Sequence, residues 1–290
     1  MKTKLRDTKV SAIKEVPLIG EPVRTFAIWG VQGSPGKSTL AINLGDIMSQ
    51  QGRRVLLVDC DLVAPSLALA LAATEVTSGL SVVCALARSA QLDASTLEQN
   101  VVKFTGGVRF DLIPGITGQS RWPEVTPSAV ETLLIAAASK YDTVVFDLSS
   151  SLEPALRTEA SALHRNELTR HLIANCDDVI MVAGADPVST QRALRQIQDA
   201  TRLHGEVGFH LVINRLRTSV LGARPERQLE RTYRDLVKRL PNFFLPDDPN
   251  TLDEAMRHGL PVRLVRRSSQ YVRAVRQLAQ RLNSNRVHAE

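Results

Sequence analysis

Thr25-Phe-Ala-Ile-Trp-Gly-Val-Gln-Gly-Ser-Pro-Gly-Lys-Ser-Thr39 is the stretch that decides the fold. Its apolar start, residues 25–29, predicts a buried strand, and residues 37–51 have the apolar spacing of a helix. A turn rich in Gly, Ser and Pro joins the two. A strand, a glycine-rich turn, Gly-Lys-Ser and a helix, in this order, indicate a phosphate-binding P-loop.

The expected chemistry of this loop comes from its backbone and two side chains. Backbone N–H groups of the turn and the positive end of the helix dipole form a site for an anion. We expect Lys37 to reach the β- and γ-phosphates and Ser38 to bind Mg²⁺ through its hydroxyl. The loop departs from the general pattern at Val31, where that pattern has Gly. The alternative is an ordinary strand-to-helix turn with an exposed lysine.

The composition is that of a large α/β domain. The chain has 290 residues and is 43% hydrophobic, which is enough for one extended core. No apolar stretch reaches about 18 residues, so no membrane-spanning helix is expected. The polar, basic N-terminus predicts no signal peptide. Three scattered cysteines predict neither a disulfide framework nor a zinc site, which favours a cytoplasmic protein.

Positive charge is concentrated in the last quarter of the chain. The net charge is +6, and the residues from Arg215 onward carry sixteen Lys and Arg against eight Asp and Glu. Such a segment is able to bind nucleic acid or an anionic membrane surface at the periphery. The alternative is a solvated, arginine-rich face. An aromatic content of 4% argues against a surface built on base stacking.

Two further apolar runs each end in a carboxylate. Residues 54–59 predict a strand that ends at Asp59, followed by Asp61 on a loop. We expect Asp59 to reach Mg²⁺ through water and Asp61 to orient or activate an attacking water. Residues 141–147 predict another strand, and Asp147 at its end has the pattern of a Walker B acid that holds Mg²⁺. The alternative for Asp59 and Asp61 is that they cap the strand end.

The serines 149–151 follow Asp147, where a loop that senses the γ-phosphate would lie. Further strands are expected at 108–114, 178–184, 208–213 and 242–245, and helices at 127–138, 154–174, 188–203, 228–239, 252–257 and 270–282, with two short helices within 75–103. Asn214 and Arg215 end one of these strands, where Asn is able to bind an adenine edge or to form an Asx cap. The last helix has one apolar stripe, which indicates packing on the sheet rather than on a membrane.

Alternating strands and helices with Val- and Leu-rich strands predict an α/β fold, namely a mainly parallel twisted sheet of about seven or eight strands with helices on both faces. The P-loop, Val55-Leu-Leu-Val-Asp-Cys-Asp61, Tyr141-Asp-Thr-Val-Val-Phe-Asp147, Val212-Ile-Asn-Arg215 and the segment 245–262 occur in the order typical of one family. The chain resembles the ParA/MinD family of P-loop ATPases. This resemblance covers about Arg24 to Leu282. We expect a single P-loop ATPase domain at 24–284, with a flexible polar tail at 1–23, as its composition indicates, and a C-terminal tail at 285–290.

The resemblance assigns roles to individual residues. Lys37 and Asp61 are implied to be catalytic, with Asp61 as the switch I carboxylate that positions water. Mg²⁺ is implied at Ser38 and Asp147, with Asp59 close by. The implied ATP-binding residues are Gln32, Gly33, Ser34, Pro35, Gly36, Lys37, Ser38, Thr39, Asn214, Arg215 and Pro246.

Family members form an ATP-sandwich homodimer that hydrolysis releases, and they position partner complexes on the nucleoid or the membrane. The resemblance therefore implies a slow ATPase switch with an unidentified protein partner, acting in pilus or secretion, division or partitioning machinery. The family loop begins with a lysine that reaches the partner's nucleotide, but this chain has Gln32 there. A contact with an ionised group is worth about 1.5–3 kcal/mol. Gly33-Ser-Pro-Gly-Lys37 is similar to the loop of the CpaE/TadZ branch. The alternative function is a nucleotide-binding scaffold with negligible hydrolysis.

Overall fold

The computed structural model describes residues 23–284, except 34, 74–78, 154–163 and 206–207. The predicted tails, apart from Val23, and the predicted ligand residue Ser34 therefore lie outside the described residues.

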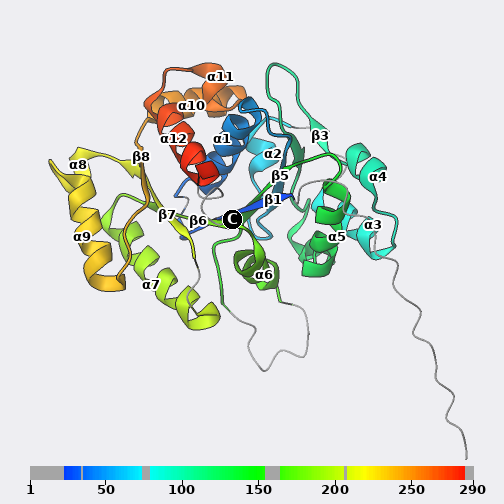
Figure 1. The fold of residues 1–290 in the computed structure, drawn as a ribbon, viewed down its shortest axis with the longest axis horizontal. Coiled ribbons are helices and arrows are strands. Elements are labelled where there is room, and N and C mark those ends of the chain that lie inside the picture. The colour runs from blue at the N-terminus through cyan, green and yellow to red at the C-terminus, as the bar shows by residue number, and fades with distance from the viewer. Residues whose placement is uncertain (1–22, 34, 74–78, 154–163, 206–207, 285–290) are drawn as a thin grey trace, which may run out of the picture.

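One eight-stranded sheet forms the centre of the described structure, in the order β3-β4-β2-β5-β1-β6-β7-β8 (Figure 1). All neighbouring strands are parallel except β3, which pairs antiparallel with β4 at the edge. The predicted mainly parallel sheet is confirmed. The strands are β1 Arg24–Gly30, β2 Val55–Cys60, β3 Val102–Lys103, β4 Asp111–Ile113, β5 Thr143–Leu148, β6 Asp178–Gly184, β7 His210–Leu216 and β8 Phe243–Pro246.

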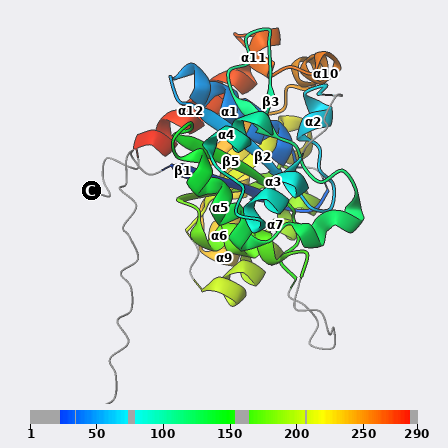
Figure 2. The same cartoon turned by 90° about the vertical axis from the view of Figure 1, so that its right-hand side faces the viewer.

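Helices cover both faces of this sheet, as Figures 1 and 2 show. One face carries α1 Lys37–Gln50, α2 Leu67–Ala70, α10 Pro249–His258, α11 Val262–Val265 and α12 Gln270–Ser284. The other face carries α3 Leu80–Arg88, α4 Ala94–Gln99, α5 Pro127–Ala137, α6 Glu167–Asn175, α7 Pro187–His204 and α9 Pro225–Val237. The short helices η1 Gln119–Glu124 and α8 Thr218–Leu221 complete the described elements.

Alternation along the strands produces two apolar cores. In β1, Ala27 and Trp29 enter the core beneath α5, α6 and α7, whereas Phe26 and Ile28 enter the core beneath α1 and α12. Because strand side chains alternate between faces, a strand buried on both sides must be apolar throughout. This explains the unbroken apolar runs in the sequence.

The last helix packs as predicted. Val272, Val275, Leu278, Ala279 and Leu282 are at most 2% exposed in the core beneath α12. Burial of this stripe against the sheet leaves it unavailable to a membrane surface.

Several predicted boundaries are wrong. Among the described residues, 164–166 form a turn, and α6 begins only at Glu167, because Asn166 donates to Ser151 Oγ and the Glu153 carbonyl instead of continuing a helix. The strand expected at 108–114 is reduced to Asp111–Ile113. The strand expected at 208–213, with Asn214 and Arg215 at its end, begins at His210 and runs on to Leu216 through an irregularity at which Arg215 has φ 58°.

Candidate functional site

The P-loop joins β1 to α1 with a backbone that suits an anion. Gly33 and Gly36 have φ of 100° and 93°, in the left-handed region that favours glycine. Helix α1 begins at Lys37, and no side chain caps its first turn. The N–H groups of a helix start lack partners within the helix, so an uncapped start beside a glycine-rich turn is able to bind a phosphate.

Two glycines allow close contacts that hold the loop in place. A Cβ atom at Gly36 would collide with Nδ2 of Asn214, which donates to the Pro35 carbonyl at 2.8 Å. A Cβ atom at Gly30 would collide with the Val182 carbonyl on β6. The loop therefore depends on β6 and β7, which come more than 140 residues later in the chain.

Lys37 is buried and turned toward the end of β5. Its Nζ donates to the Leu148 carbonyl at 2.6 Å and to Ser150 Oγ at 3.0 Å, and it lies 3.5 Å from Asp61 Oδ2. The contact places Ser150 beside the P-loop lysine, whereas the role of serines 149–151 as a loop that senses the γ-phosphate remains a prediction. An ammonium group held by a carbonyl, a hydroxyl and a carboxylate has partners that a phosphate is able to replace.

Asp61 is held on its loop as an anion. Its Oδ1 accepts hydrogen bonds from the N–H groups of Val63 and Ala64 and from Ser149 Oγ. Burial alone would raise its pKa, but attraction to Lys37 and these hydrogen bonds outweigh burial, so the pKa lies below its usual value. The carboxylate is therefore ionised at neutral pH and able to accept a proton or a hydrogen bond.

Asp147 lies at the end of β5 with no exposed surface. Neither carboxylate oxygen accepts a well-formed hydrogen bond from the described residues, although the Ser38 hydroxyl is close enough to lower its pKa. Burial dominates and raises this pKa to about 6, against the attraction of Lys37. A buried carboxylate without partners is costly, so these oxygens fit a group absent from the structure, namely a cation.

This donor set suits Mg²⁺. Mg²⁺ prefers oxygen ligands and is bound in proteins by one or two carboxylates, with water and substrate phosphates completing its shell. Ser38 and Asp147 supply a hydroxyl and a carboxylate of that kind. Within the described residues no group of three or more His, Cys, Asp or Glu side chains forms a closed metal site.

Asp59 pairs in register with Asp147 on the neighbouring strand. Its Oδ2 accepts from the N–H groups of Ser66 and Leu67 at 2.8 and 2.9 Å. Burial first, and then repulsion from Asp147, raise its pKa to about 8. Asp59 therefore holds the backbone at the start of α2, and its role toward Mg²⁺ remains a prediction.

A model for the CobQ/CobB/MinD/ParA nucleotide binding domain matches residues 26–262. The chain belongs to this family. The predicted ParA/MinD resemblance is therefore confirmed, and the P-loop lies within the matched residues.

Individual relatives agree with this family. The antiactivator FleN of Pseudomonas aeruginosa is 25% identical over 193 residues, which are 67% of this chain and 62% of FleN, so the match spans less than two thirds of that relative. A ParA family ATPase from Chlorobium tepidum superposes with a TM-score of 0.73 at 21% identity, covering 89% of this chain and 98% of the other. The septum site-determining protein MinD of Pyrococcus horikoshii, complexed with Mg-ADP, has a TM-score of 0.67 at 20% identity, with coverage of 90% and 96%. The structural matches establish the fold.

The residues predicted to bind adenine lie at the ends of β7 and β8. Pro246 lines a cavity of about 480 Å³ together with Leu216, Arg217, Thr218, Pro225, Glu226 and Phe244. Asn214 is 3% exposed and is occupied by the Pro35 carbonyl and the Arg215 N–H. Its contact with adenine remains a prediction, and in this structure the carboxamide instead fastens the P-loop to β7.

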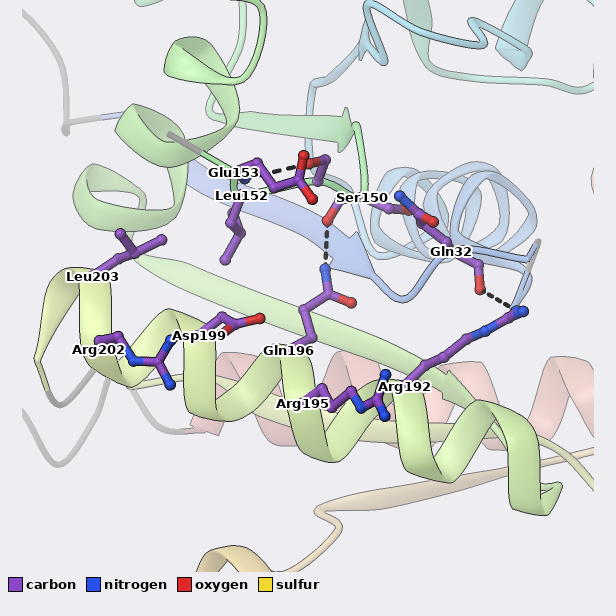
Figure 3. Close-up of a pocket in the computed structure, with 11 residues that line it drawn as sticks. Gln32, Ser150, Leu152, Glu153, Arg192, Arg195, Gln196, Asp199, Arg202 and Leu203 are labelled. Carbon is purple, nitrogen blue, oxygen red and sulfur yellow. Dashed lines mark hydrogen bonds and ion pairs between the residues drawn. The ribbon is translucent and has the colours of Figure 1, made fainter. Parts of the chain in front are cut away.

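A second cavity, of about 600 Å³, opens beside the start of the P-loop (Figure 3). The loop after β5 and helix α7 line it, and Gln32 and Ser150 lie between this cavity and Lys37. Sequence analysis missed its α7 residues, Arg192 and Gln196. They stand 160 and 166 residues from their P-loop partners, so no local pattern connects them.

One membrane criterion applies to the described residues. None of their helices combines the length and the apolar character that crossing a bilayer requires.

Proposed function

We propose that this chain is an ATP-dependent molecular switch that binds Mg-ATP, hydrolyses it slowly and thereby positions or assembles a partner complex. The observation that supports this most directly is the bare carboxylate of Asp147. It is buried next to the Ser38 hydroxyl, at the start of an uncapped P-loop helix in a family of nucleotide-binding domains.

The roles of the residues follow from their contacts. The backbone N–H groups between Gln32 and Thr39, except at Pro35, which has none, hold the phosphates, and Lys37 leaves Ser150 and Asp61 to bind them. Ser38 and Asp147 hold Mg²⁺, with Asp59 behind them. When bound, the cation neutralises phosphate charge and polarises the terminal phosphoryl group.

Release of Lys37 has a consequence for Asp61. In the structure Asp61 lies 3.5 Å from the Lys37 ammonium. Once a phosphate takes this ammonium, the Asp61 carboxylate is free to accept a hydrogen bond from the attacking water. The same event releases Ser150 Oγ, which is then able to donate to the terminal phosphate. Binding of nucleotide to Lys37 would thus change the contacts of both the Asp61 loop and the Ser150 loop.

Partners and location are part of the proposal. We infer an ATP-dependent homodimer and a protein partner that the sequence does not identify, as the relatives suggest, among them a MinC:MinD cell division complex from Aquifex aeolicus. The similarity of Gly33-Ser-Pro-Gly-Lys37 to the loop of the CpaE/TadZ branch supports pilus or secretion machinery as one of the contexts. We further propose one cytoplasmic ATPase domain over residues 24–284.

A change at Lys37 tests the site. Calorimetric titration with Mg-ATP is expected to show micromolar binding for the wild type and at least about 100-fold weaker binding for Lys37→Ala, because a buried charge-assisted contact to phosphate is lost. Light scattering with Mg-ADP and then Mg-ATP measures the dimer. The switch would be contradicted if Lys37→Ala bound Mg-ATP as tightly as the wild type. It would also be contradicted if the molecular mass were the same with Mg-ADP and with Mg-ATP.

The second candidate is a nucleotide-binding scaffold with negligible hydrolysis, and Gln32 favours it because its amide carries no charge. Asp61→Ala separates the two functions. A switch loses phosphate release and gains dimer lifetime when Asp61 is removed, whereas a scaffold shows neither change.

A basic stripe on α9 favours nucleic acid as an additional partner. Arg224, Arg227, Arg231, Arg234 and Lys238 are all exposed, and their spacing of three or four residues places them on the side opposite the buried Leu229 and Tyr233. Glu226, Glu230 and Asp235 reduce this charge, and Arg231 pairs with Asp235 at 3.6 Å. Duplex DNA retardation that weakens steeply between 50 and about 200 mM salt supports the surface.

A further inference from the structure

Arg192 on α7 reaches across to the P-loop. Its Nη1 donates to the Gln32 carbonyl at 3.1 Å, and Figure 3 shows the side chain extended toward that residue at the edge of the cavity. Gln32 is itself exposed, and its side chain is neutral. The Arg192 guanidinium, which belongs to a helix distant in sequence, therefore brings a positive charge next to Gln32, whose own side chain has none.

The loop is shaped around this guanidinium. A Cβ atom at Gly33 would collide with Arg192 Nη1, and the φ of 100° at Gly33 also favours glycine. With the guanidinium in this position, a side chain at 33 would have to displace it, so the glycine leaves room for the contact between Arg192 and the P-loop backbone.

The guanidinium still has donors to offer. A guanidinium carries five N–H donors, and the Gln32 carbonyl uses one of them. Among the described residues Arg192 has no ion-pair partner, so a neutral carbonyl is the acceptor that orients it. An arginine placed in this way is ready for an anion, because charge-assisted contacts to phosphate are stronger than contacts to a carbonyl.

Helix α7 is also fixed relative to Lys37. One turn after Arg192, Gln196 Nε2 donates to the Gly30 carbonyl at 3.3 Å and to the Ser150 carbonyl. The hydroxyl of that same Ser150 accepts from Lys37 Nζ. Ser150 thus links Lys37 to Gln196, one turn after Arg192 on the same helix.

We propose that Arg192 is the second cation of the nucleotide site and that it contacts the terminal phosphate of a nucleoside triphosphate held by the same chain. This rests on the proposed ATP-binding function. Charge on the transferring phosphoryl group is stabilised in phosphoryl transfer by an arginine supplied from outside the P-loop, and Arg192 is placed to take this role. Gln32 then serves through its backbone carbonyl, which holds the arginine in position.

Arg195 provides a matched control. It lines the same cavity one turn further along α7 and carries the same charge, but no hydrogen bond or ion pair joins it to the described residues of the P-loop. Arg192→Ala is expected to lower kcat for ATP by about 10²-fold, the cost of removing one preorganised donor to the transition state, with KM changed by less than about threefold. Arg192→Lys is expected to recover part of the loss, and Arg195→Ala to stay within about twofold of the wild type.

Binding of Mg-ADP with and without fluoroaluminate provides a readout that does not depend on turnover. The wild type is expected to bind the fluoroaluminate complex at least about 10²-fold more tightly than Mg-ADP alone, and Arg192→Ala to lose this gain while keeping its affinity for Mg-ADP. Thermal unfolding of all variants shows whether the fold is intact.

The two assays distinguish failure of the proposed ATP hydrolysis from failure of the proposed contact between Arg192 and the terminal phosphate. A wild type without turnover overturns the proposed hydrolysis, yet loss of the fluoroaluminate gain in Arg192→Ala still supports the contact with the terminal phosphate. Equal behaviour of Arg192→Ala and Arg195→Ala in both assays overturns the role of Arg192. A wild type that shows no fluoroaluminate gain overturns it as well.

Discussion

Two buried carboxylates lie near helix α1, and the protein treats them differently. Asp46, in the body of the helix, receives two hydrogen bonds from Arg263 on α11, at 2.7 and 2.9 Å, so its charge is neutralised within the chain. Asp147, near the start of the helix, is equally buried, but no described residue forms a proper hydrogen bond to it.

The difference is between a buried charge that has a partner within the chain and one for which we propose a bound cation. The chain contains an arginine for Asp46, since an unpaired buried charge would be destabilising in every state of the protein. No arginine meets Asp147, and the resulting cost is retained at the place where a cation would remove it. Natural proteins often keep such destabilised groups at sites where they act.

The largest effect on the free energy of unfolding is expected when the ion pair between Asp46 and Arg263 is broken. Arg263→Ala leaves Asp46, which is 1% exposed, without its partner and also removes the hydrogen bond to the Gly107 carbonyl. Breaking a buried pair on one side costs about 3–5 kcal/mol of unfolding free energy. Urea unfolding monitored by circular dichroism measures the loss.

A double variant serves as the control for this prediction. Asp46→Leu combined with Arg263→Met replaces both charges with apolar groups of similar size, and such replacements are often close to neutral. The double variant is therefore expected to be more stable than Arg263→Ala. If it were as unstable as the single variant, packing rather than charge would be the dominant contribution.

A smaller change in the free energy of unfolding, of opposite sign, is expected when the charge of Asp147 is removed. Folding raises the pKa of Asp147 from 3.8 to about 6, so the folded state loses stability as the pH rises from about 4 to about 6, and the full cost is present above that range. Asp147→Asn removes this charge and is expected to raise the unfolding free energy of the ligand-free protein by about 1–3 kcal/mol at pH 7.5, with no gain below about pH 4.

With nucleotide bound, the wild type is expected to become more stable than Asp147→Asn. Mg-ATP is expected to raise the melting temperature of the wild type and to raise that of Asp147→Asn much less, because binding to the folded state alone is stabilising. An Asp147→Asn variant that is less stable than the wild type without ligand would show that the carboxylate has a structural partner.

The smallest effect is expected at a pair that is neither buried nor functional. Glu98 bridges Lys103 and Lys140 at 2.7 Å each, with all three side chains substantially exposed. Exposed pairs contribute little because water and salt screen them. Glu98→Gln should leave the urea midpoint unchanged within error. A loss of unfolding free energy as large as that of Arg263→Ala would contradict the claim that burial makes an ion pair important for stability.

Much of the fold was predictable because it depends on local patterns. The apolar runs of β1, β2, β5 and β6 identify strands buried on both faces, and the turn before Lys37 identifies the P-loop. The two-residue strand β3 was missed, since two edge residues carry no periodic signal. The start of α6 was misplaced because Asn166 binds the loop after β5, a contact between segments that no local pattern reveals.

The candidate site divides in the same way. Lys37, Ser38, Asp61 and Asp147 follow apolar runs or glycine-rich turns, and the structure brings them together. For Asn214, its position at a strand end was predictable, but its bond to the Pro35 carbonyl was not. Arg192 was not predictable at all, because an exposed arginine in an amphipathic helix resembles its neighbours until folding places it at Gln32.

The strand order also has a consequence for synthesis of the chain. Strand β1 emerges first from the ribosome, but its neighbours in the sheet are β5 and β6, which begin at residues 143 and 178. Domains fold as units while the chain is made, and contacts between distant residues form slowly. A nascent chain that has reached α5 therefore carries an apolar strand β1 whose two partner strands have not yet been made.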